Sequence, residues 1–240
     1  MRLDRYLAQM SIGTRSEVKR FIKSGRVFVN GVRAVDCGQK IATGDDVMFD
    51  GESVAWEPFE YYMLNKPQGT VSSTKDRDCR TVVSLITTSS RDDLFPVGRL
   101  DKDTEGLLLV TNDGALAHEL LAPGKHVWKR YLVRAEGILS EDDIAQLQHG
   151  VSIGDDKPTL PARVDLREDT TGGEEEASTW LELSIREGRY HQIKRMLAAV
   201  GHPVLYLKRL SMGRLQLDEY LRPGEYRRLT EEEIALLKGQ

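Results

Sequence analysis

The stretch Gly98-Arg99-Leu100-Asp101-Lys102-Asp103-Thr104-Glu105-Gly106 runs directly into Leu107-Leu108-Leu109-Val110, a short apolar run typical of a buried strand. It places three carboxylates and two cations between two glycines. A charged, glycine-bounded segment that enters a core strand is a loop held on a rigid element, and such loops often carry function. The alternative interpretation is a solvated turn, which composition alone leaves open.

Three chemistries could use the acids of this loop. Asp101 and Asp103 could bind a hard cation, yet no matching cluster of His or acidic residues accompanies them. A phosphoaspartate enzyme would need Asp-x-Asp-x-Thr after a uniformly apolar strand, whereas Thr104 comes one position too early and Arg99 interrupts the strand. The third chemistry is a carboxylate acting at a sugar carbon, which requires an ionised acid in a sheltered pocket beside a cation.

Four motifs follow one another along the chain, and together they resemble those of RNA pseudouridine synthases of the RsuA family. The catalytic motif of that family resembles Gly98-Arg99-Leu100-Asp101 with Thr104 and Gly106. The other three are Lys66-Pro67-x-Gly69, Lys129-Arg130-Tyr131 and Glu187-Gly188-Arg189-Tyr190-His191-Gln192-Ile193-Lys194-Arg195-Met196. The N-terminal segment also resembles the S4 RNA-binding domain that these enzymes carry, so the resemblance covers nearly the whole chain.

The resemblance implies an α+β fold in two domains. Residues 1–50 are expected to form a small S4-like α/β RNA-binding domain, residues 51–59 a linker, and residues 60–240 the catalytic domain. In this family the catalytic domain is built on a mixed, mainly antiparallel β-sheet flanked by helices. The residues agree locally: 61–64 and 179–185 predict strands, 115–121 and 190–200 predict helices, and the Gly- and Glu-rich segment 169–178 predicts a surface loop.

Pseudouridine formation, the activity that the resemblance implies, breaks the bond between ribose C1′ and uracil N1, turns the base and rejoins it through C5. The matching motif gives the acting carboxylate to Asp101, as a nucleophile or as the base of an elimination. Lys194 matches the basic residue paired with that aspartate, and Tyr131 matches the tyrosine that packs on the target base. His191 as a general base is a further possibility that the matched motifs do not favour.

Neither a cofactor nor a metal is implied, because the reaction oxidises, transfers and hydrolyses nothing. The sequence holds no dinucleotide fingerprint and no P-loop. The expected partner is ribosomal RNA: 16S rRNA or a particle on the way to the small subunit. Two alternatives remain, a 23S rRNA pseudouridine synthase and a non-catalytic rRNA-binding or ribosome-assembly protein.

Several cations of the catalytic domain are expected to contact this RNA. Arg99 would help to pry the target nucleotide from its stack or hold its phosphate, since the base must be flipped before chemistry. Arg189 and Arg195 belong to the basic last motif, and Arg195 is also the alternative partner of Asp101 if the helix is rotated by one position. Lys66 is assigned to RNA as well, although a lysine at a turn is often structural.

The first forty residues show a helix followed by a hairpin. Thr14-Arg15-Ser16-Glu17 has the form of a capping box and predicts a helix over residues 15–24, while Asn30-Gly31 predicts the turn of a hairpin. Cations recur every fourth residue on one side of this helix, so we expect them to grip RNA phosphates by shape rather than by sequence. The expected contacts are Arg15, Lys19, Lys23 and Arg26.

Charge is segregated along the chain. The net charge of −4, from 34 Lys and Arg against 38 Asp and Glu, argues against a general polyanion binder. Residues 1–34, however, hold eight cations against two acids, and residues 186–214 hold seven against one. Acids gather elsewhere, as in Glu174-Glu175-Glu176. Local basic surfaces can therefore bind RNA while the whole chain stays acidic.

Length and composition bound the remaining possibilities. At 240 residues the chain suits one large or two modest domains, and no apolar run approaches the roughly eighteen residues of a membrane-spanning helix. The charged start lacks the apolar region of a signal peptide, so we expect a cytoplasmic protein. We also expect a monomer. Cys37 and Cys79 are far apart in sequence and predict ordinary thiols rather than a disulfide or a zinc site.

Overall fold

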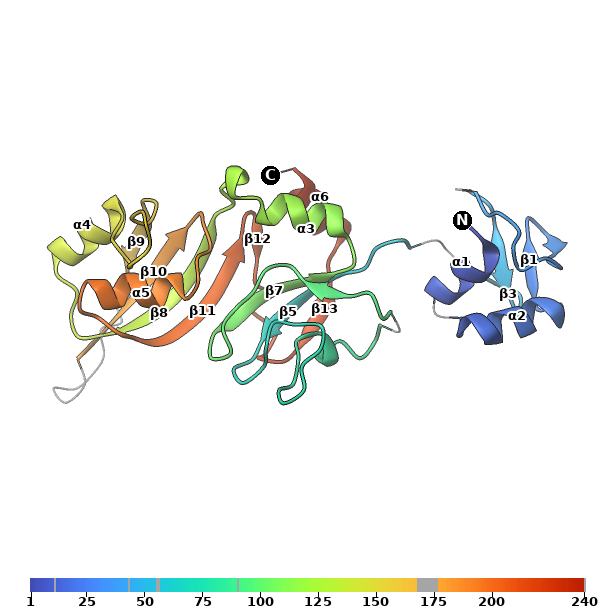
Figure 1. Ribbon diagram of the computed structural model, residues 1–240, viewed down its shortest axis with the longest axis horizontal. Helices are drawn as coiled ribbons and strands as arrows, with labels where there is room; N and C mark the ends of the chain where they lie inside the picture. The colour runs from blue at the N-terminus through green and yellow to red at the C-terminus, as the bar shows by residue number, and fades with distance from the viewer. Residues whose placement is uncertain (11, 43, 55–56, 90, 168–176, 240) are drawn as a thin grey trace. The chain divides into compact units, whose positions relative to one another are not determined.

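The computed structural model describes residues 1–10, 12–42, 44–54, 57–89, 91–167 and 177–239, drawn in Figure 1. Contacts divide the chain into an N-terminal unit, Met1–Glu60 with Thr87–Asp93, and a C-terminal unit, Tyr61–Ile86 with Leu94–Gln240. The surface loop expected over 169–178 lies outside the described residues, except for its last two. None of the described helices is long and apolar enough to cross a bilayer.

The N-terminal unit packs two helices, α1 (Leu3–Gln9) and α2 (Arg15–Lys23), against a small antiparallel sheet. The strand order is β2-β1-β3-β4, with β1 at Val27–Val29, β2 at Val32–Arg33, β3 at Val47–Phe49 and β4 at Glu52–Ser53. The apolar sides of both helices and of the two central strands form one core, which includes Leu3, Leu7, Val18, Ile22, Val27 and Val47.

Both local sequence signals in this unit are confirmed. The Thr14 hydroxyl accepts a hydrogen bond from Glu17 N, and the Glu17 carboxylate accepts one from Thr14 N at 2.8 Å, so the capping box begins α2. Asn30 and Gly31 have φ angles of 51° and 77°, which the tight turn between β1 and β2 requires. Gly25 follows the helix with φ of 81°.

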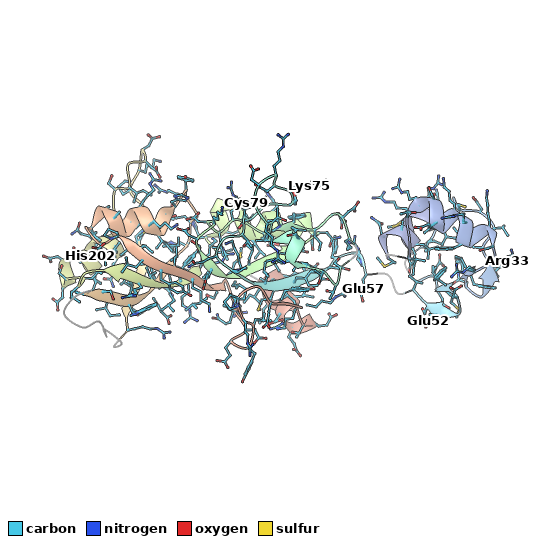
Figure 2. All side chains as sticks on the ribbon, turned by 90° about the horizontal axis from the view of Figure 1, so that it is seen from below. Arg33, Glu52, Glu57, Lys75, Cys79 and His202 are labelled. Atoms are coloured by element: carbon cyan, nitrogen blue, oxygen red, sulfur yellow. The ribbon has the colours of Figure 1, made fainter. Side chains whose placement is uncertain are left out.

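Part of the segment expected as a linker belongs to the N-terminal sheet. Strand β4 pairs with β3, and the Tyr6 hydroxyl donates to the Val54 carbonyl at 2.5 Å. Glu52 on β4 and Arg33 on β2 are exposed on the two edge strands of this sheet (Figure 2). The domain boundaries at residues 50 and 60 stay a prediction.

The C-terminal unit is built on one nine-stranded sheet in the order β13-β5-β7-β11-β8-β10-β9, with β12 beside β11 and β6 beside β7. Among the described strand pairs of this sheet only β7–β11 is parallel, so the sheet is mixed and mainly antiparallel, as expected. The strands are β5 (Tyr61–Lys66), β6 (Phe95–Pro96), β7 (Glu105–Thr111), β8 (Lys129–Glu136), β9 (Arg163–Leu166), β10 (Ser178–Ile185), β11 (Val204–Met212), β12 (Leu215–Gln216) and β13 (Tyr226–Arg228).

Helices cover the central strands on both faces. The alternate residues of β7 show this: Leu107 and Leu109 join one core, which α3 and α6 close, and Leu108 and Val110 join the other, which α5 closes. This explains why the β7 run is continuously apolar rather than alternating. The described helices are α3 (Gly114–Leu121), α4 (Glu141–His149), α5 (Gln192–Ala199), α6 (Glu231–Lys238) and the short 3-10 turns η1 (Val83–Leu85) and η2 (Pro123–Lys125).

Candidate active site

The loop that carries Asp101 connects β6 to β7, and its backbone is fixed on both sides of that residue. Gly98 turns the chain with φ of 76°. The Ser72 hydroxyl accepts a hydrogen bond from Leu100 N at 3.0 Å and donates one to the Leu100 carbonyl at 2.9 Å. Thr104 N then donates to the Asp101 carbonyl at 3.1 Å. The Asp101 carboxylate is thus presented by a rigid turn.

Lys66, at the end of β5, is fully buried, with 0% of its surface exposed. Its ammonium donates to the carbonyls of Thr104 (2.8 Å), Pro67 (3.1 Å) and Lys102 (3.4 Å). Burial lowers the pKa of Lys66 to about 8, although nearby carboxylates oppose the fall. The expectation that Lys66 contacts RNA is therefore wrong: its amine has no exposed surface and instead ties the loop to β5.

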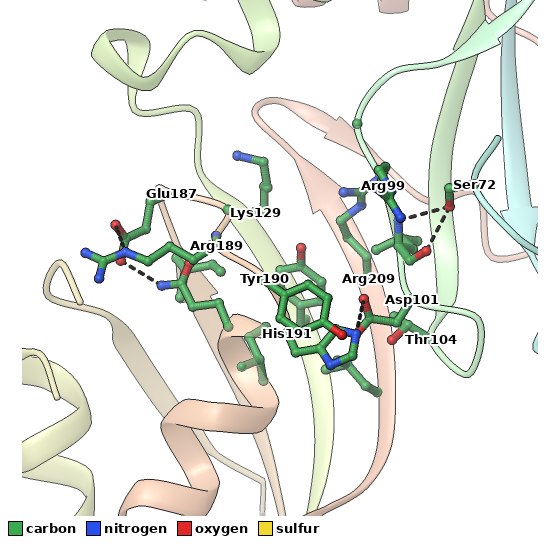
Figure 3. Close-up of a pocket in the computed structure, with 18 of the residues that line it drawn as sticks. Ser72, Arg99, Asp101, Thr104, Lys129, Glu187, Arg189, Tyr190, His191 and Arg209 are labelled. Atoms are coloured by element: carbon green, nitrogen blue, oxygen red, sulfur yellow. Dashed lines mark hydrogen bonds and ion pairs between the residues drawn. The ribbon is translucent and has the colours of Figure 1, made fainter. Parts of the chain in front are cut away.

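A lysine and a histidine side chain meet the Asp101 carboxylate. Lys194 Nζ lies 3.2 Å from Asp101 Oδ2. His191 Nε2 lies 3.4 Å from Asp101 Oδ1, a contact that is visible in Figure 3. Lys194 also bonds Asp103 Oδ1 at 2.5 Å, a shorter contact than the one to Asp101. The pairing of Asp101 with Lys194 that the resemblance implied is thus present, but Lys194 is shared between two acids. Arg195, the alternative partner, does not take this place.

The sharing of Lys194 changes the acidity of the groups around it. The hydrogen bond from Lys194 holds the pKa of Asp103 below its usual value, although partial burial acts in the opposite direction. Partial burial lowers the pKa of Lys194, but its bonds to Asp103 and Asp101 outweigh this effect, so that the pKa is raised overall. Lys194 is therefore a permanent cation at neutral pH.

The geometry of Lys194 and His191 follows from the way α5 begins. His191 adopts a left-handed backbone conformation, with φ of 48°, directly before the helix. The helix consequently starts at Gln192, two residues later than the expected start at Tyr190. The Tyr190 ring, which is 75% exposed, stacks on the His191 ring with centroids 3.8 Å apart. The sequence motif gave no sign of this backbone conformation or of the contact between His191 and Asp101.

Asp101, Lys194 and Tyr131 line one cavity of about 870 Å³. Sites for small molecules commonly occupy about 300–1,000 Å³, so the cavity could admit a nucleoside. Tyr131 on β8 is 7% exposed, and the exposed Arg99 lines the same cavity. The walls come from the loop before β7, from the β10–α5 connection, from β8 and β11, and from the end of α3. Residues distant in the sequence thus converge as the motifs predicted.

Arg189, which lines the same cavity, and Arg195 both bind backbone carbonyls. Arg189 donates to the carbonyls of Lys157 (2.6 Å) and Pro158 (2.8 Å) and pairs with Glu187. Arg195 donates to the carbonyls of Tyr190 and Ile153 and pairs with Asp155. Both guanidinium groups therefore fasten the segment 153–158 to the start of α5. Both side chains thus have a structural role, and their expected contacts with RNA stay a prediction.

Two further cavity residues were not assigned from the sequence. Arg209 on β11 is 2% exposed, and Lys129 on β8 is partly buried. Lys129 stood in a quoted motif, whereas Arg209 lay in a basic segment without an assigned role. The sequence signal that could have identified Arg209 as buried is its place in β11. Residues 207, 209 and 211 alternate along this strand and are all buried.

The expected RNA-binding cations of the N-terminal unit divide into two kinds. Arg15, Lys19 and Lys23 are exposed along α2. Arg26 instead forms a two-pronged ion pair with Asp50, and its guanidinium lies 4.5 Å from the ring centroid of Phe21. Arg26 therefore has a partner that competes with phosphate.

Among the residues that the structure describes, no group of three or more His, Cys, Asp and Glu side chains is placed to hold a metal ion. Cys37 and Cys79 are both free thiols. Cys79 accepts a hydrogen bond from Lys102 Nζ at 3.3 Å.

With this fold and this cavity, the chain belongs to the RNA pseudouridylate synthase family: the family model of that description matches residues 60–199, and an S4 domain matches residues 1–47. Members of this family are isomerases, so the protein is an RNA pseudouridine synthase. The similarity to individual relatives extends over nearly the whole chain. An uncharacterized RNA pseudouridine synthase of Bacillus subtilis, YtzG, is 48% identical over 239 residues, which is 99% of this chain and 98% of the relative.

Two further proteins also match this chain over nearly its full length. Ribosomal small subunit pseudouridine synthase A of Escherichia coli is 41% identical, covering 98% of this chain and 99% of its own length. A crystal structure of a pseudouridylate synthase superposes with a TM-score of 0.68 at 37% identity and covers 99% of both chains. The similarity to these two proteins therefore extends over nearly their whole length.

Proposed function

We propose that this chain converts one uridine of small-subunit (16S) ribosomal RNA to pseudouridine, with Asp101 acting at ribose C1′. The observation that carries the proposal is the Asp101 carboxylate, 3.2 Å from the Lys194 ammonium on the wall of a cavity large enough for a nucleoside. The choice of 16S rRNA is supported by the relatives at 41% identity whose names specify the ribosomal small subunit.

The role of Lys194 in this proposal is electrostatic. When RNA closes the cavity and excludes water, the Asp101 carboxylate loses the solvation of its charge. A permanent cation at 3.2 Å compensates for this loss. Asp103 occupies the other side of Lys194, at 2.5 Å, and helps to fix the ammonium in place. Asp103 is therefore a positioning residue in this proposal rather than a catalytic one.

The reaction rearranges bonds within one nucleotide. The C1′–N1 bond breaks and its electron pair moves to the uracil ring. The ribose is stabilised either by a bond from an Asp101 oxygen to C1′ or by loss of a proton from C2′. After the base has turned, C5 bonds to C1′ while the Asp101–C1′ bond breaks in the first route, or while the proton returns to C2′ in the second. The proton on C5 then leaves and N1 gains a proton. Atoms and electrons balance within the nucleotide, the two mechanisms differing only in how Asp101 is used.

The remaining cavity residues bind the flipped nucleotide. Tyr131 supports the extruded base, because its ring lines the cavity while most of its surface is packed in the core. Arg99 is exposed at the same cavity and holds the phosphate of the displaced nucleotide. In the N-terminal unit, the exposed face of α2 binds phosphates of the surrounding RNA through Arg15, Lys19 and Lys23. We place this reaction in the cytoplasm, on a monomeric enzyme.

Mapping of pseudouridines in both large rRNAs of a deletion strain tests the choice of substrate. One pseudouridine should disappear from 16S rRNA, return with the wild-type gene and not return with Asp101→Asn. Loss of a site from 23S rRNA instead would contradict the target, and unchanged maps would favour a non-catalytic role in assembly. Incubating the purified enzyme with free 16S rRNA and with partly assembled small subunits then identifies the form that is modified.

A further inference from the structure

One atom of a buried guanidinium in the wall of the cavity has no partner among the residues that the structure describes. Arg209 is 2% exposed, and its Nε donates to the Leu107 carbonyl at 2.7 Å. Within the described part of the chain, the buried Nη2 of Arg209 has no hydrogen-bond acceptor. An orphaned buried donor on a charged group is destabilising, so it needs a reason to persist. Because Arg209 lines the cavity, a bound ligand can supply the acceptor.

The position of Arg209 is set by two neighbouring strands. On the parallel side it is in register with Gly106, whose φ is 101°, and a Cβ added there would lie 2.2 Å from the Arg209 carbonyl oxygen. Only glycine permits this close approach of β7 and β11. On the antiparallel side Arg209 is in register with Tyr131. Residues directly opposite in such a pair project from the same face, so Arg209 lies beside the residue proposed to support the base.

Lys129 adds a second positive charge to the same wall. It precedes Tyr131 by two residues on β8 and so shares its face of the sheet. Its ammonium donates to the Val127 carbonyl at 3.1 Å. Burial and, to a smaller extent, the positive charge of Arg209 together lower the pKa of Lys129 to about 8. Neither cation has an ion pair with a carboxylate among the described residues, so this wall is suited to negative charge (Figure 3).

We propose that Arg209 donates from Nη2 to a carbonyl oxygen of the flipped uracil and stabilises the negative charge that the ring gains when the C1′–N1 bond breaks. This rests on the proposed function and deepens it. The electron pair of the broken bond spreads from N1 to the carbonyl oxygens of the ring, and Arg209 binds that charge by hydrogen bonding without giving up a proton. The positive charge of Lys129 on the same wall adds to this electrostatic stabilisation of the uracil ring. The charge develops whichever way Asp101 acts.

A phosphate is the less suitable ligand for Arg209. Its guanidinium is almost wholly enclosed and stands opposite Tyr131, where the base is expected, whereas the exposed Arg99 is available to a backbone phosphate. A group that binds phosphate would contribute equally before and during the reaction. A group that binds the developing anion contributes more in the transition state and so affects the rate rather than the affinity.

The test compares Arg209→Gln, Arg209→Lys and Lys129→Met with wild type, using 16S rRNA or the assembling particle that carries tritium at uracil C5. The single-turnover rate at saturating RNA and the Kd for RNA are measured separately. We expect Arg209→Gln to lower the saturated rate about 100-fold with Kd changed less than twofold, and Arg209→Lys to recover part of the rate. The control is Arg222→Gln, which removes an exposed arginine that does not line the cavity.

Two results would overturn the proposal. If Arg209→Gln raises the Kd while its saturated rate equals that of wild type, Arg209 anchors a phosphate. If Arg209→Gln is unfolded by circular dichroism, Lys129→Met decides: a saturated rate equal to wild type rejects the electropositive wall, and a slower rate at unchanged Kd supports it. Failure of the proposed function looks different, because then wild-type enzyme itself releases no tritium from 16S rRNA.

Discussion

Lys194 Nζ lies 3.2 Å from Asp101 Oδ2, and this contact joins the first turn of α5 to the loop before β7. The same ammonium reaches Asp103 at 2.5 Å and so carries two carboxylates at once. One cation therefore fixes the loop and supplies the counter-charge for two of its acids.

Replacing Lys194 tests this shared role. Lys194→Met should lower the rate of pseudouridine formation by about 100-fold or more, because two neighbouring acids lose their counter-charge. Lys194→Arg keeps the charge and should retain much more activity. Tritium release at saturating RNA measures both. Equal activity of Lys194→Met and wild type would show that Asp101 needs no cation.

The pH dependence of activity should reveal Lys129. Its pKa of about 8 means that it loses its positive charge as the pH rises through this value. If Lys129 contributes to the field around the uracil, kcat/KM should fall between about pH 7 and pH 9. Lys129→Met should be slower at pH 7 and show a flatter profile over this range. Identical profiles for variant and wild type would contradict the role of Lys129.

Lys66 should affect stability and its pH dependence. Lys66→Met leaves three carbonyls without their shared donor and should lower the free energy of unfolding at pH 7 by about 1–3 kcal/mol. Between about pH 8 and the unfolded value of 10.5, the unfolded chain binds a proton at Lys66 that the folded chain has lost. Wild type should thus gain stability from Lys66 across this window, and the variant should lack that gain. Urea denaturation at pH 7, 8, 9 and 10 measures the difference.

The α2 face is tested by charge reversal. Lys19→Glu with Lys23→Glu should weaken binding to 16S rRNA and flatten the dependence of log Kd on log salt by about one unit for each lost phosphate contact. Arg26→Gln is the matched control, because the ion pair of Arg26 with Asp50 already occupies its guanidinium. An affinity and a salt slope that do not change in the double variant would remove α2 from the RNA interface.

Gly106 offers a test of the sheet geometry. Gly106→Ala places a Cβ 2.2 Å from the Arg209 carbonyl oxygen at a position with φ of 101°. We expect a loss of about 2–4 kcal/mol in the free energy of unfolding. Gly31→Ala is the control, since its φ is also positive but nothing lies within 4 Å of the added atom. Similar losses in both variants would mean that backbone conformation alone is responsible.

Local signals in the sequence predicted local structure well. The capping box of Thr14 and Glu17, the turn at Asn30 and the continuously apolar run before Thr111 each correspond to an observed element. These signals depend on nearest neighbours, whose chemistry is visible in sequence. The contact between Asp101 and Lys194 was predicted from the resemblance of the ordered motifs to those of a known family. Spacing alone does not place two residues from different elements together.

What was missed depends on partners that a sequence does not show. Arg189 and Lys66 are bound largely by backbone carbonyls, which every residue carries, so nothing in the pattern distinguishes them from cations that face RNA. His191 reaches Asp101 only because its own backbone is left-handed. Arg209 is buried because Gly106 lets two strands approach closely, a relation that becomes visible only once β7 and β11 are known to pair.

The central claim is that the Asp101 carboxylate acts at ribose C1′. Its most direct test is to measure isomerisation of the same tritium-labelled RNA by Asp101→Asn and by Asp103→Asn. We expect Asp101→Asn to bind the RNA with the affinity of wild type and to release no tritium, because the amide can neither attack C1′ nor accept a proton from C2′. Asp103→Asn should keep substantial activity, since it only positions Lys194. Tritium release by Asp101→Asn at a rate close to wild type would contradict the account.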